Sequence, residues 1–368
     1  MSTAVESPEV PEQVIEAPSA VATKKTRRNQ FIALGALAAL GAVPIPFGDY
    51  GFFIGQYAAV YAMLGLSVTI VTGYAGLISL MPYTFAGLGA VMTGLIMTGW
   101  GWPFWLAAPM AALATLPVSL VVGMASVRLK TLYLAIATLT FSTALGETFF
   151  RWDLVTGGRI GWTVASPQLG PIDFGTDLNF YLLCLLVVLG LVWMTEGLRT
   201  SRLGRAMLAV RDNELEAQAL GINVYKTKLA AFVLSGMMAG FGGAFLAVLL
   251  GNVSPGGYQS PVAEVTSILL VSLVVIGGID RAWGAFFGAI SLVVQSQVFQ
   301  GARFFFPFFG MYSAFFLMLF LLFRPGGLVQ VSKITTELVK RRPVFGIAVV
   351  LVTVALNLGI AYIFIRAS

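Results

Sequence analysis

The sequence predicts an all-α membrane protein whose helices form a polytopic transmembrane bundle. Of its 368 residues, 58% are hydrophobic and only 10% are charged, whereas soluble domains carry about 25% charged residues. The mean hydropathy is +0.89. The apolar residues gather in runs long enough to cross a bilayer, and the 41 glycines suit helices that approach one another closely in lipid.

We expect about eleven transmembrane spans, because one crossing takes roughly 17–25 apolar residues. Residues 1–28 are predicted to be a disordered cytoplasmic tail, since their Pro, Glu, Ser and Ala content is unlike that of a signal peptide. About ten spans form the main body, 29–330, and residues 331–368 supply a basic linker and one more helix. The apolar runs lie at residues 31–47, 52–72, 75–98, 103–127, 131–150, 180–195, 229–251, 263–279, 284–300, 304–323 and 344–365.

The basic residues are distributed unequally between the two sides of this map. With the N-terminus inside, only Arg151, Arg159, Arg303 and Arg366 lie outside, and the remaining eighteen of the 22 Lys and Arg residues lie inside. Cytoplasmic loops of membrane proteins carry such an excess of positive charge. The map therefore places the polar segment 199–228 in the cytoplasm and the C-terminus outside. It also explains the formal charge of +6 without nucleic-acid binding.

Several kinds of chemistry are excluded by residue content. The chain has no histidine and one cysteine, Cys184, which excludes His metal sites, Cys/His nucleophile pairs and an internal disulfide. No segment matches GxxxxGK[ST], so the chain has no Walker-type phosphate loop and is not expected to hydrolyse ATP. Acids occur near span ends, at Glu147 and Glu264, with no paired set at depth. No catalytic or metal-binding residues are therefore predicted.

The segment 199–228 is the least hydrophobic stretch in the interior of the chain. Taken as one helix from Leu203, it places apolar residues on two sides. The first side holds Leu203, Met207, Val210, Ala217 and Gly221, with Glu214 among them; the second holds Leu208, Leu215 and Ala219. Such a helix suits docking between the membrane domain and a soluble partner. A helix resting in the membrane interface is the alternative. Gly221 offers a stop or sharp turn.

Two apolar regions contain residues typical of irregular backbone. Gly73 and Gly76, with Pro82 soon after, predict an interrupted segment, which is tolerated at membrane depth only where it is buried or lines a cavity. Simple helix packing is the alternative. The threonines at 138 and 140 either line a path or bond back to their own helix. The residues considered for a translocation path are Gly73, Tyr74, Gly76, Ser79, Pro82, Thr138, Thr140 and Glu264.

Several segments then resemble one known family. RDNELEAQALGIN, Arg211 to Asn223, resembles the EAA loop of ABC-importer permeases, and its surroundings from Ser201 to Phe245 are similar to the LivM-type branched-chain amino-acid permease family. The same family is matched, in order, by GYAGLISLMPYTFAGLGA (Gly73–Ala90), LYLAIATLTF (Leu132–Phe141), WDLVTGG (Trp152–Gly158) and Ser254–Ala289. Here Glu216-Ala217-Gln218 replaces Glu-Ala-Ala. After FRPGGL (Phe323–Leu328), where the family usually ends, this chain adds its extra helix.

The resemblance implies a transport role without bound cofactors. Segment 199–228 would fit a groove on a cytoplasmic ATPase, and Arg205 and Arg211 would either pair with acids there or be solvated. The residues expected to couple to the ATPase are Arg205, Arg211, Asn213, Glu214, Glu216, Ala217, Ala219, Gly221 and Ile222. ATP and Mg²⁺ would bind at that partner.

The resemblance also implies the rest of the assembly. The other partners would be a second, LivH-like permease, an extracytoplasmic substrate-binding protein and membrane lipid, in the bacterial inner membrane. Branched-chain amino acids are the implied substrates. Urea, amides or aromatic acids are alternatives within the family, and an ion-coupled secondary transporter is the alternative outside it.

Overall fold

The computed structural model describes residues 48–301, except 127–128, 130, 159, 170–171 and 260–261. The predicted N-terminal tail, the runs at 31–47, 304–323 and 344–365, and the linker after 331 lie outside these residues. Within them the chain is helical with a few short strands, as the apolar runs predict.

Four helices in the described part are long and apolar enough to cross a membrane. They are α2 (Gly48–Val68) with its π-helical extension η2 (Thr69–Tyr74), α4 (Phe104–Ser126), α7 (Asp177–Thr200) and α10 (Val224–Leu250). Up to five spans result when the bent pair α11 (Val262–Gly277) and α12 (Ala282–Gly301) is counted as one. The total of about eleven is therefore not confirmed.

Two shorter helices account for the predicted runs at 75–98 and 131–150. The chain leaves helical geometry after Tyr74 and re-enters it at Pro82, where α3 (Pro82–Gly94) begins and continues into η3 (Leu95–Gly99). Proline suits a first helical position because its missing N–H has no partner there. The predicted interruption after Gly73 is confirmed. The second run forms α5 (Thr131–Glu147).

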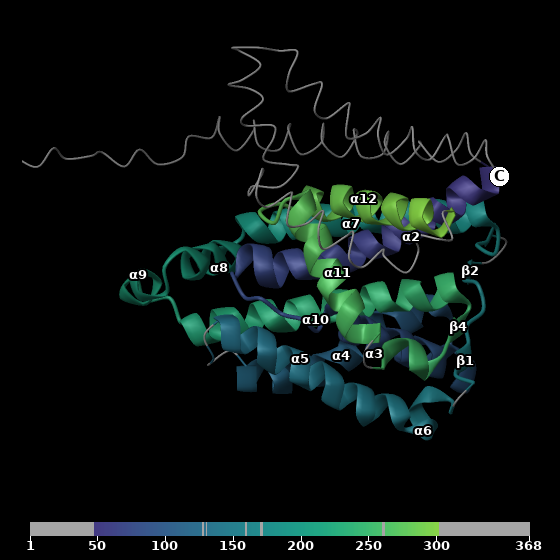
Figure 1. Ribbon diagram of the computed structural model, residues 1–368, viewed down its shortest axis with the longest axis horizontal. Helices are drawn as coiled ribbons and strands as arrows, with labels where there is room; N and C mark the ends of the chain where they lie inside the picture. Colours follow the sequence, from purple (N-terminus) through teal and green to yellow (C-terminus); the bar gives the residue numbers. More distant parts are fainter. Residues whose placement is uncertain are drawn as a thin grey trace, which may run out of the picture.

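The core is built around α10, which packs against α2, α3 and α4 (Figure 1). Its contact with α3 depends on small residues: a Cβ placed on Gly89 would lie 2.0 Å from the Gly240 carbonyl oxygen. The two backbones thus touch directly, as glycine-rich interfaces in membranes allow. Phe85 and Phe232 meet edge to face on the same pair of helices, with ring centroids 5.9 Å apart.

A sharp elbow joins α11 and α12. The two helices differ in direction by 116° across a break of at most four residues. The runs at 263–279 and 284–300 were expected to be two independent crossings, whereas the structure connects them through this bend. We call residues Gly278–Arg281 the elbow.

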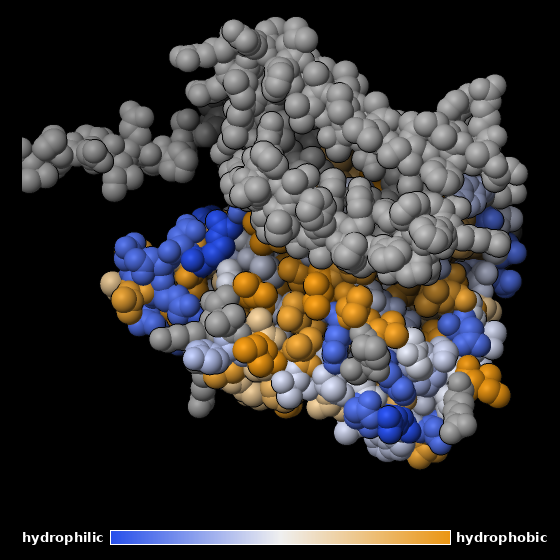
Figure 2. Space-filling model, viewed as in Figure 1, coloured by the Kyte–Doolittle hydropathy of each residue, from blue (hydrophilic) through white to orange (hydrophobic). Residues whose placement is uncertain are grey.

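The two ends of the molecule differ. The helices α8 (Arg202–Asp212) and α9 (Glu214–Ala219) extend from one end (Figure 1). The opposite end carries η4 (Phe149–Arg151), α6 (Asp153–Thr156), β1 (Trp162–Thr163), β2 (Gln168–Leu169), β3 (Ile172–Asp173), β4 (Asn252–Val253) and η5 (Pro255–Tyr258). Strand β1 pairs antiparallel with β4, and β2 with β3. Hydrophilic atoms gather over both ends and hydrophobic atoms between them (Figure 2).

Candidate coupling site

The polar segment 199–228 folds as two helices rather than the single helix expected from Leu203. The break is at Asn213, whose backbone is extended (φ −156°, ψ 113°). Its side-chain oxygen accepts hydrogen bonds from the N–H groups of Leu215 (3.0 Å) and Glu216 (3.4 Å), while its amide donates to Glu216 Oε1 (2.6 Å). This reciprocal capping starts a new helix, and it explains why the sequence does not continue the first one.

One predicted side of this segment is buried against the membrane domain. Met207, Val210 and Ala217 are fully buried, so the docking of this side is confirmed for them. Gly221 and Glu214, which were assigned to the same side, are exposed instead. The break at Asn213 changes the direction of the chain, so the helical pattern counted from Leu203 does not extend past it.

The other side of α9 is apolar and uncovered in the described part of the chain. Leu215 is 76% exposed and Leu220 is 78% exposed, and Ala219 is exposed between them. Figure 2 shows hydrophobic atoms among hydrophilic ones over α9. We call Leu215, Glu216, Ala219 and Leu220 the α9 face.

Gly221 ends α9 as the sequence predicts. Its φ is +79°, its N–H donates to the Gln218 carbonyl (2.9 Å), and the N–H of Ile222 donates to the Ala217 carbonyl (3.0 Å). This is the Schellman arrangement, in which a left-handed glycine closes a helix. Asn223 then caps α10 by accepting from the N–H of Lys226 (2.9 Å).

Glu214 holds α9 to the start of α10. Its Oε1 lies 2.5 Å from Lys228 Nζ, and the Lys228 side chain is only 8% exposed. A nearly buried ammonium needs a paired acid, so Glu214 has a contact within its own chain that the sequence pattern did not indicate.

Arg211 points into the molecule. Its Nη1 donates to the Gly73 carbonyl oxygen (2.5 Å) and to Asp280 Oδ1 (2.8 Å), and its side chain is 28% exposed. The guanidinium thus pairs with Asp280, and at 3.4 Å with the neighbouring Asp212, two acids of its own chain that the sequence pattern did not connect with it. Arg205 is exposed, and its Nη1 donates to the nearby Thr200 carbonyl (2.9 Å).

The first three residues considered for a translocation path lie at this same end. A Cβ on Gly76 would lie 2.6 Å from Arg211 Cγ. Tyr74 is fully buried, and its hydroxyl donates to the Thr195 carbonyl of α7 (3.4 Å). The structure thus brings Gly73 and Gly76 to Arg211, which the sequence analysis assigns to a separate site, while Tyr74 next to them bonds to α7.

The remaining path residues divide into inward and outward positions. Ser79 and Thr138 are buried, and Thr138 Oγ1 accepts from the N–H of Leu80 (3.0 Å) just before Pro82 begins α3. Thr140 is exposed and donates to the Ile136 carbonyl of its own helix (3.0 Å). Glu264 Oε1 accepts from Thr143 Oγ1 (2.6 Å), joining α11 to α5.

Two acids that the sequence analysis missed complete this end of the molecule. Asp280 lies in the elbow, and Glu196 Oε1 accepts from the N–H of Ala282 (3.2 Å), the first residue of α12. In the sequence Asp280 precedes Arg281 in a short loop between apolar runs, where charges typically mark topology. Only the fold brings it to Arg211.

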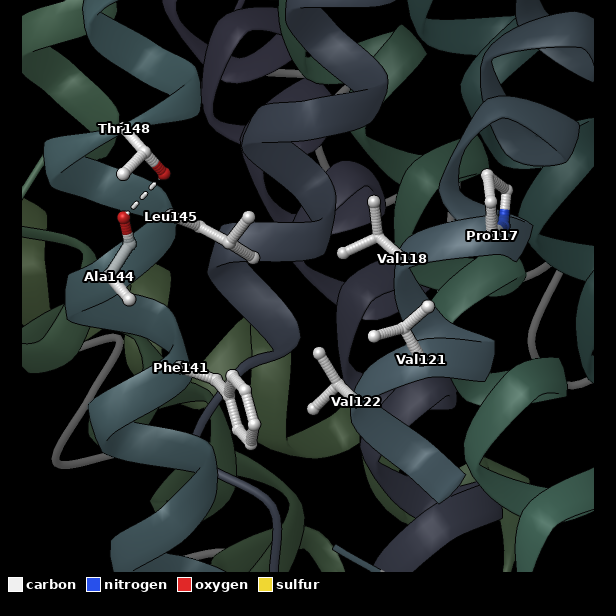
Figure 3. A pocket seen from close by; sticks show the side chains of 8 residues that line it. All are labelled: Pro117, Val118, Val121, Val122, Phe141, Ala144, Leu145 and Thr148. Atoms are coloured by element: carbon white, nitrogen blue, oxygen red, sulfur yellow. Dashed lines mark hydrogen bonds between the residues drawn. The ribbon is translucent and has the colours of Figure 1, made fainter. Parts of the chain in front are cut away.

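A pocket of about 340 Å³ lies between α4 and α5 (Figure 3). Its lining is almost wholly apolar, and the Thr148 hydroxyl is occupied by the Ala144 carbonyl (2.7 Å). Charged groups lose too much hydration in such a place to bind there. The lining residues are Pro117, Val118, Val121, Val122, Phe141, Ala144, Leu145 and Thr148.

Comparisons with known proteins agree with the resemblance seen in the motifs. A family model described as the permease component of a branched-chain amino acid transport system matches residues 52–324. The chain is 29% identical over 308 residues to the high-affinity branched-chain amino acid transport system permease protein LivM of Salmonella typhimurium and to that of Escherichia coli. Each alignment covers 76% of this chain and 70% of the relative.

A third relative is matched over most of its length. The permease protein BraD of the corresponding Pseudomonas aeruginosa system is 26% identical over 289 residues, which is 74% of this chain and 92% of BraD. No solved structure matches the chain. The family match extends over more than half of the chain, so this protein belongs to the permease family of branched-chain amino acid transport systems.

Proposed function

We propose that this chain is the transmembrane permease of a bacterial ABC importer that carries branched-chain amino acids through the inner membrane. The family match and the LivM relatives support the transport role and the substrate class. The observation that carries the mechanism is the α9 face, where two leucines are exposed on a helix whose opposite side, at Ala217, is buried. An exposed apolar patch with a polar rim is typical of a protein interface.

The partner at the α9 face is a cytoplasmic ATPase subunit. ATP and Mg²⁺ bind to that subunit, and this chain binds no cofactor. The end that carries α8 and α9 faces the cytoplasm, because the excess of basic residues falls on that side of the sequence map. The opposite end, with its short strands, faces the substrate-binding protein. A second, LivH-like permease completes the pathway, membrane lipid surrounds both, and the C-terminus lies outside.

The proposal is tested by co-purification of the tagged, full-length permease with the ATPase encoded in the same transport system. We expect Leu215→Asp combined with Leu220→Asp to reduce the recovered ATPase at least about tenfold. A loss of about 1.4 kcal/mol in binding free energy has that effect, and burial of two leucine side chains contributes more than this amount. Leu154→Asp is the matched control, since Leu154 is 79% exposed on α6 at the opposite end. Equal recovery with the double variant and the control would contradict the assignment of the α9 face.

A transport assay separates the ABC importer from an ion-coupled transporter. Proteoliposomes that contain this chain and its permease partner, with the binding protein supplied, should take up leucine only when the ATPase and ATP are also present. Uptake driven by an ion gradient without the ATPase would overturn the proposal. Competition by urea, amides or aromatic acids tests the alternative substrates.

A further inference from the structure

We propose that Arg211 is a positioning residue that transmits movement of α9 to the elbow between α11 and α12. We call its contacts with the Gly73 carbonyl and Asp280 the Arg211 clasp. The inference rests on the proposed function, because it gives the ATPase contact at α9 a route into the membrane helices. The ATPase docks on the α9 face, and Arg211 acts after docking, when α9 moves.

Arg211 lies at the point of segment 199–228 where α8 meets α9. It lies in the last turn of α8, two residues before Asn213, and only this one extended residue separates α8 from α9. The backbone N–H of Asn213 still donates to the Ala209 carbonyl of α8 (3.0 Å), while its side chain caps α9. A displacement of α9 therefore also moves the end of α8, because Asn213 connects the two helices and is hydrogen-bonded to both.

The clasp joins the end of η2 to the elbow. One nitrogen, Nη1 of Arg211, bonds to both the carbonyl of Gly73, at the end of η2, and the carboxylate of Asp280, in the elbow. A charge-assisted hydrogen bond of this kind is about twice as strong as a neutral one. Three segments far apart in the sequence thus meet at a single cationic group.

The end of η2 and the elbow are packed directly against each other. A Cβ on Gly73 would lie 2.1 Å from the Ile279 carbonyl oxygen, so the end of η2 and the elbow are in backbone contact. Packed elements in such contact shift together or not at all, since close-packed interiors deform little. Movement at Arg211 therefore reaches both segments.

The elbow also has an anchor on its far side. Glu196 of α7 bonds to the N–H of Ala282, two residues after Asp280. The elbow is held by α7 on one side and by Arg211 on the other. A change in the angle between α11 and α12 then depends on how far α8 moves relative to α7.

The experiment uses the complete transporter in proteoliposomes and measures leucine uptake and ATP hydrolysis together. The variants are Arg211→Gln and Asp280→Asn, each of which breaks the ion pair from one side, and their combination. We expect the ATPase to remain bound and active while leucine imported per ATP falls about fivefold or more, the range of a coupling free energy between two sites. The double variant should be no worse than Arg211→Gln alone, because Arg211→Gln already removes the contact with Asp280.

Gly190→Ala in α7 is the control, since a Cβ at this position would meet no atom within 4 Å and Gly190 takes no part in the clasp. It should leave the uptake per ATP unchanged. Normal uptake per ATP in both clasp variants would overturn the inference. So would loss of the ATPase from the complex, which would make Arg211 an anchor for docking. Failure of the unaltered transporter to use ATP would overturn the proposed function itself, a distinct result.

Discussion

A single side chain, that of Asn213, determines where segment 199–228 bends. Asn213 interrupts a stretch whose apolar pattern continues on either side, because its side chain bonds to the N–H groups of the following turn. Asparagine does this more readily than it continues a helix. The bend turns Leu215 and Leu220 outward while Met207 stays buried, so one cap residue separates the exposed α9 face from the anchored helix.

Loss of this cap provides the first prediction at the residue scale. We expect Asn213→Ala to destabilise α9 by about 1 kcal/mol, the usual value of an N-cap. Because α9 is only six residues long, the effect should appear as faster amide hydrogen exchange in 214–219. Exchange in α10 beyond Lys228, the residue that pairs with Glu214, should stay unchanged, because Asn223 caps that helix separately. Unchanged exchange in α9 would contradict the role of the cap.

Tyr258 provides a second prediction at this scale. Its hydroxyl is buried and finds no hydrogen-bond partner in the part of the chain that the structure describes, and its ring packs between those of Tyr83 and Phe150. An unsatisfied buried hydroxyl costs about 1–3 kcal/mol. Tyr258→Phe should therefore raise the thermal unfolding temperature of the purified protein.

Tyr74→Phe is the matched control for Tyr258→Phe, because the Tyr74 hydroxyl is buried but bonded to Thr195. It should leave the unfolding temperature unchanged or lower it. A fall in unfolding temperature for Tyr258→Phe would show that its hydroxyl has a partner.

At the scale of helices, apolar runs predict position well where packing is continuous. The runs at 103–127 and 229–251 correspond to α4 and α10 within a few residues. The elbow between α11 and α12 could not be predicted this way. The elbow contacts Gly73, Arg211 and Glu196, which are distant in sequence and carry no periodic signal.

Packing of α3 on α10 gives the prediction for this scale. Gly89→Ala should destabilise the protein by more than about 2 kcal/mol, because the new methyl group would meet the Gly240 carbonyl at 2.0 Å and overpacking typically costs about 1–3 kcal/mol. Gly190→Ala is the control, since Gly190 lies in α7 and a Cβ at this position would meet no atom within 4 Å. Similar unfolding temperatures for the two variants would contradict the close contact.

For the molecule as a whole, we propose that its two ends lie on opposite sides of the membrane, and this orientation can be measured. Cys184, the only cysteine, is buried in α7 and should not react with a membrane-impermeant maleimide. We expect Leu220→Cys to be labelled only from the cytoplasmic side and Leu154→Cys only from the outside. Labelling of both variants from one side would contradict the proposed arrangement.

The candidate site was predictable from the sequence only in part. The polar segment, its buried residues Met207 and Val210, and the stop at Gly221 followed from pattern and glycine chemistry. The inward turn of Arg211 did not, because a lone arginine in a basic loop has the same local sequence whether it meets water or a distant acid. Asp280 was missed for the same reason.

We propose that a separate ATPase drives transport by acting on α9. The most direct measurement is ATP-dependent leucine uptake by the reconstituted transporter, comparing the unaltered permease with the variant that carries both Leu215→Asp and Leu220→Asp. We predict ATP-dependent uptake for the first, and for the second a loss of uptake together with the loss of bound ATPase. Uptake at the unaltered rate in the double variant would show that the ATPase does not act through α9.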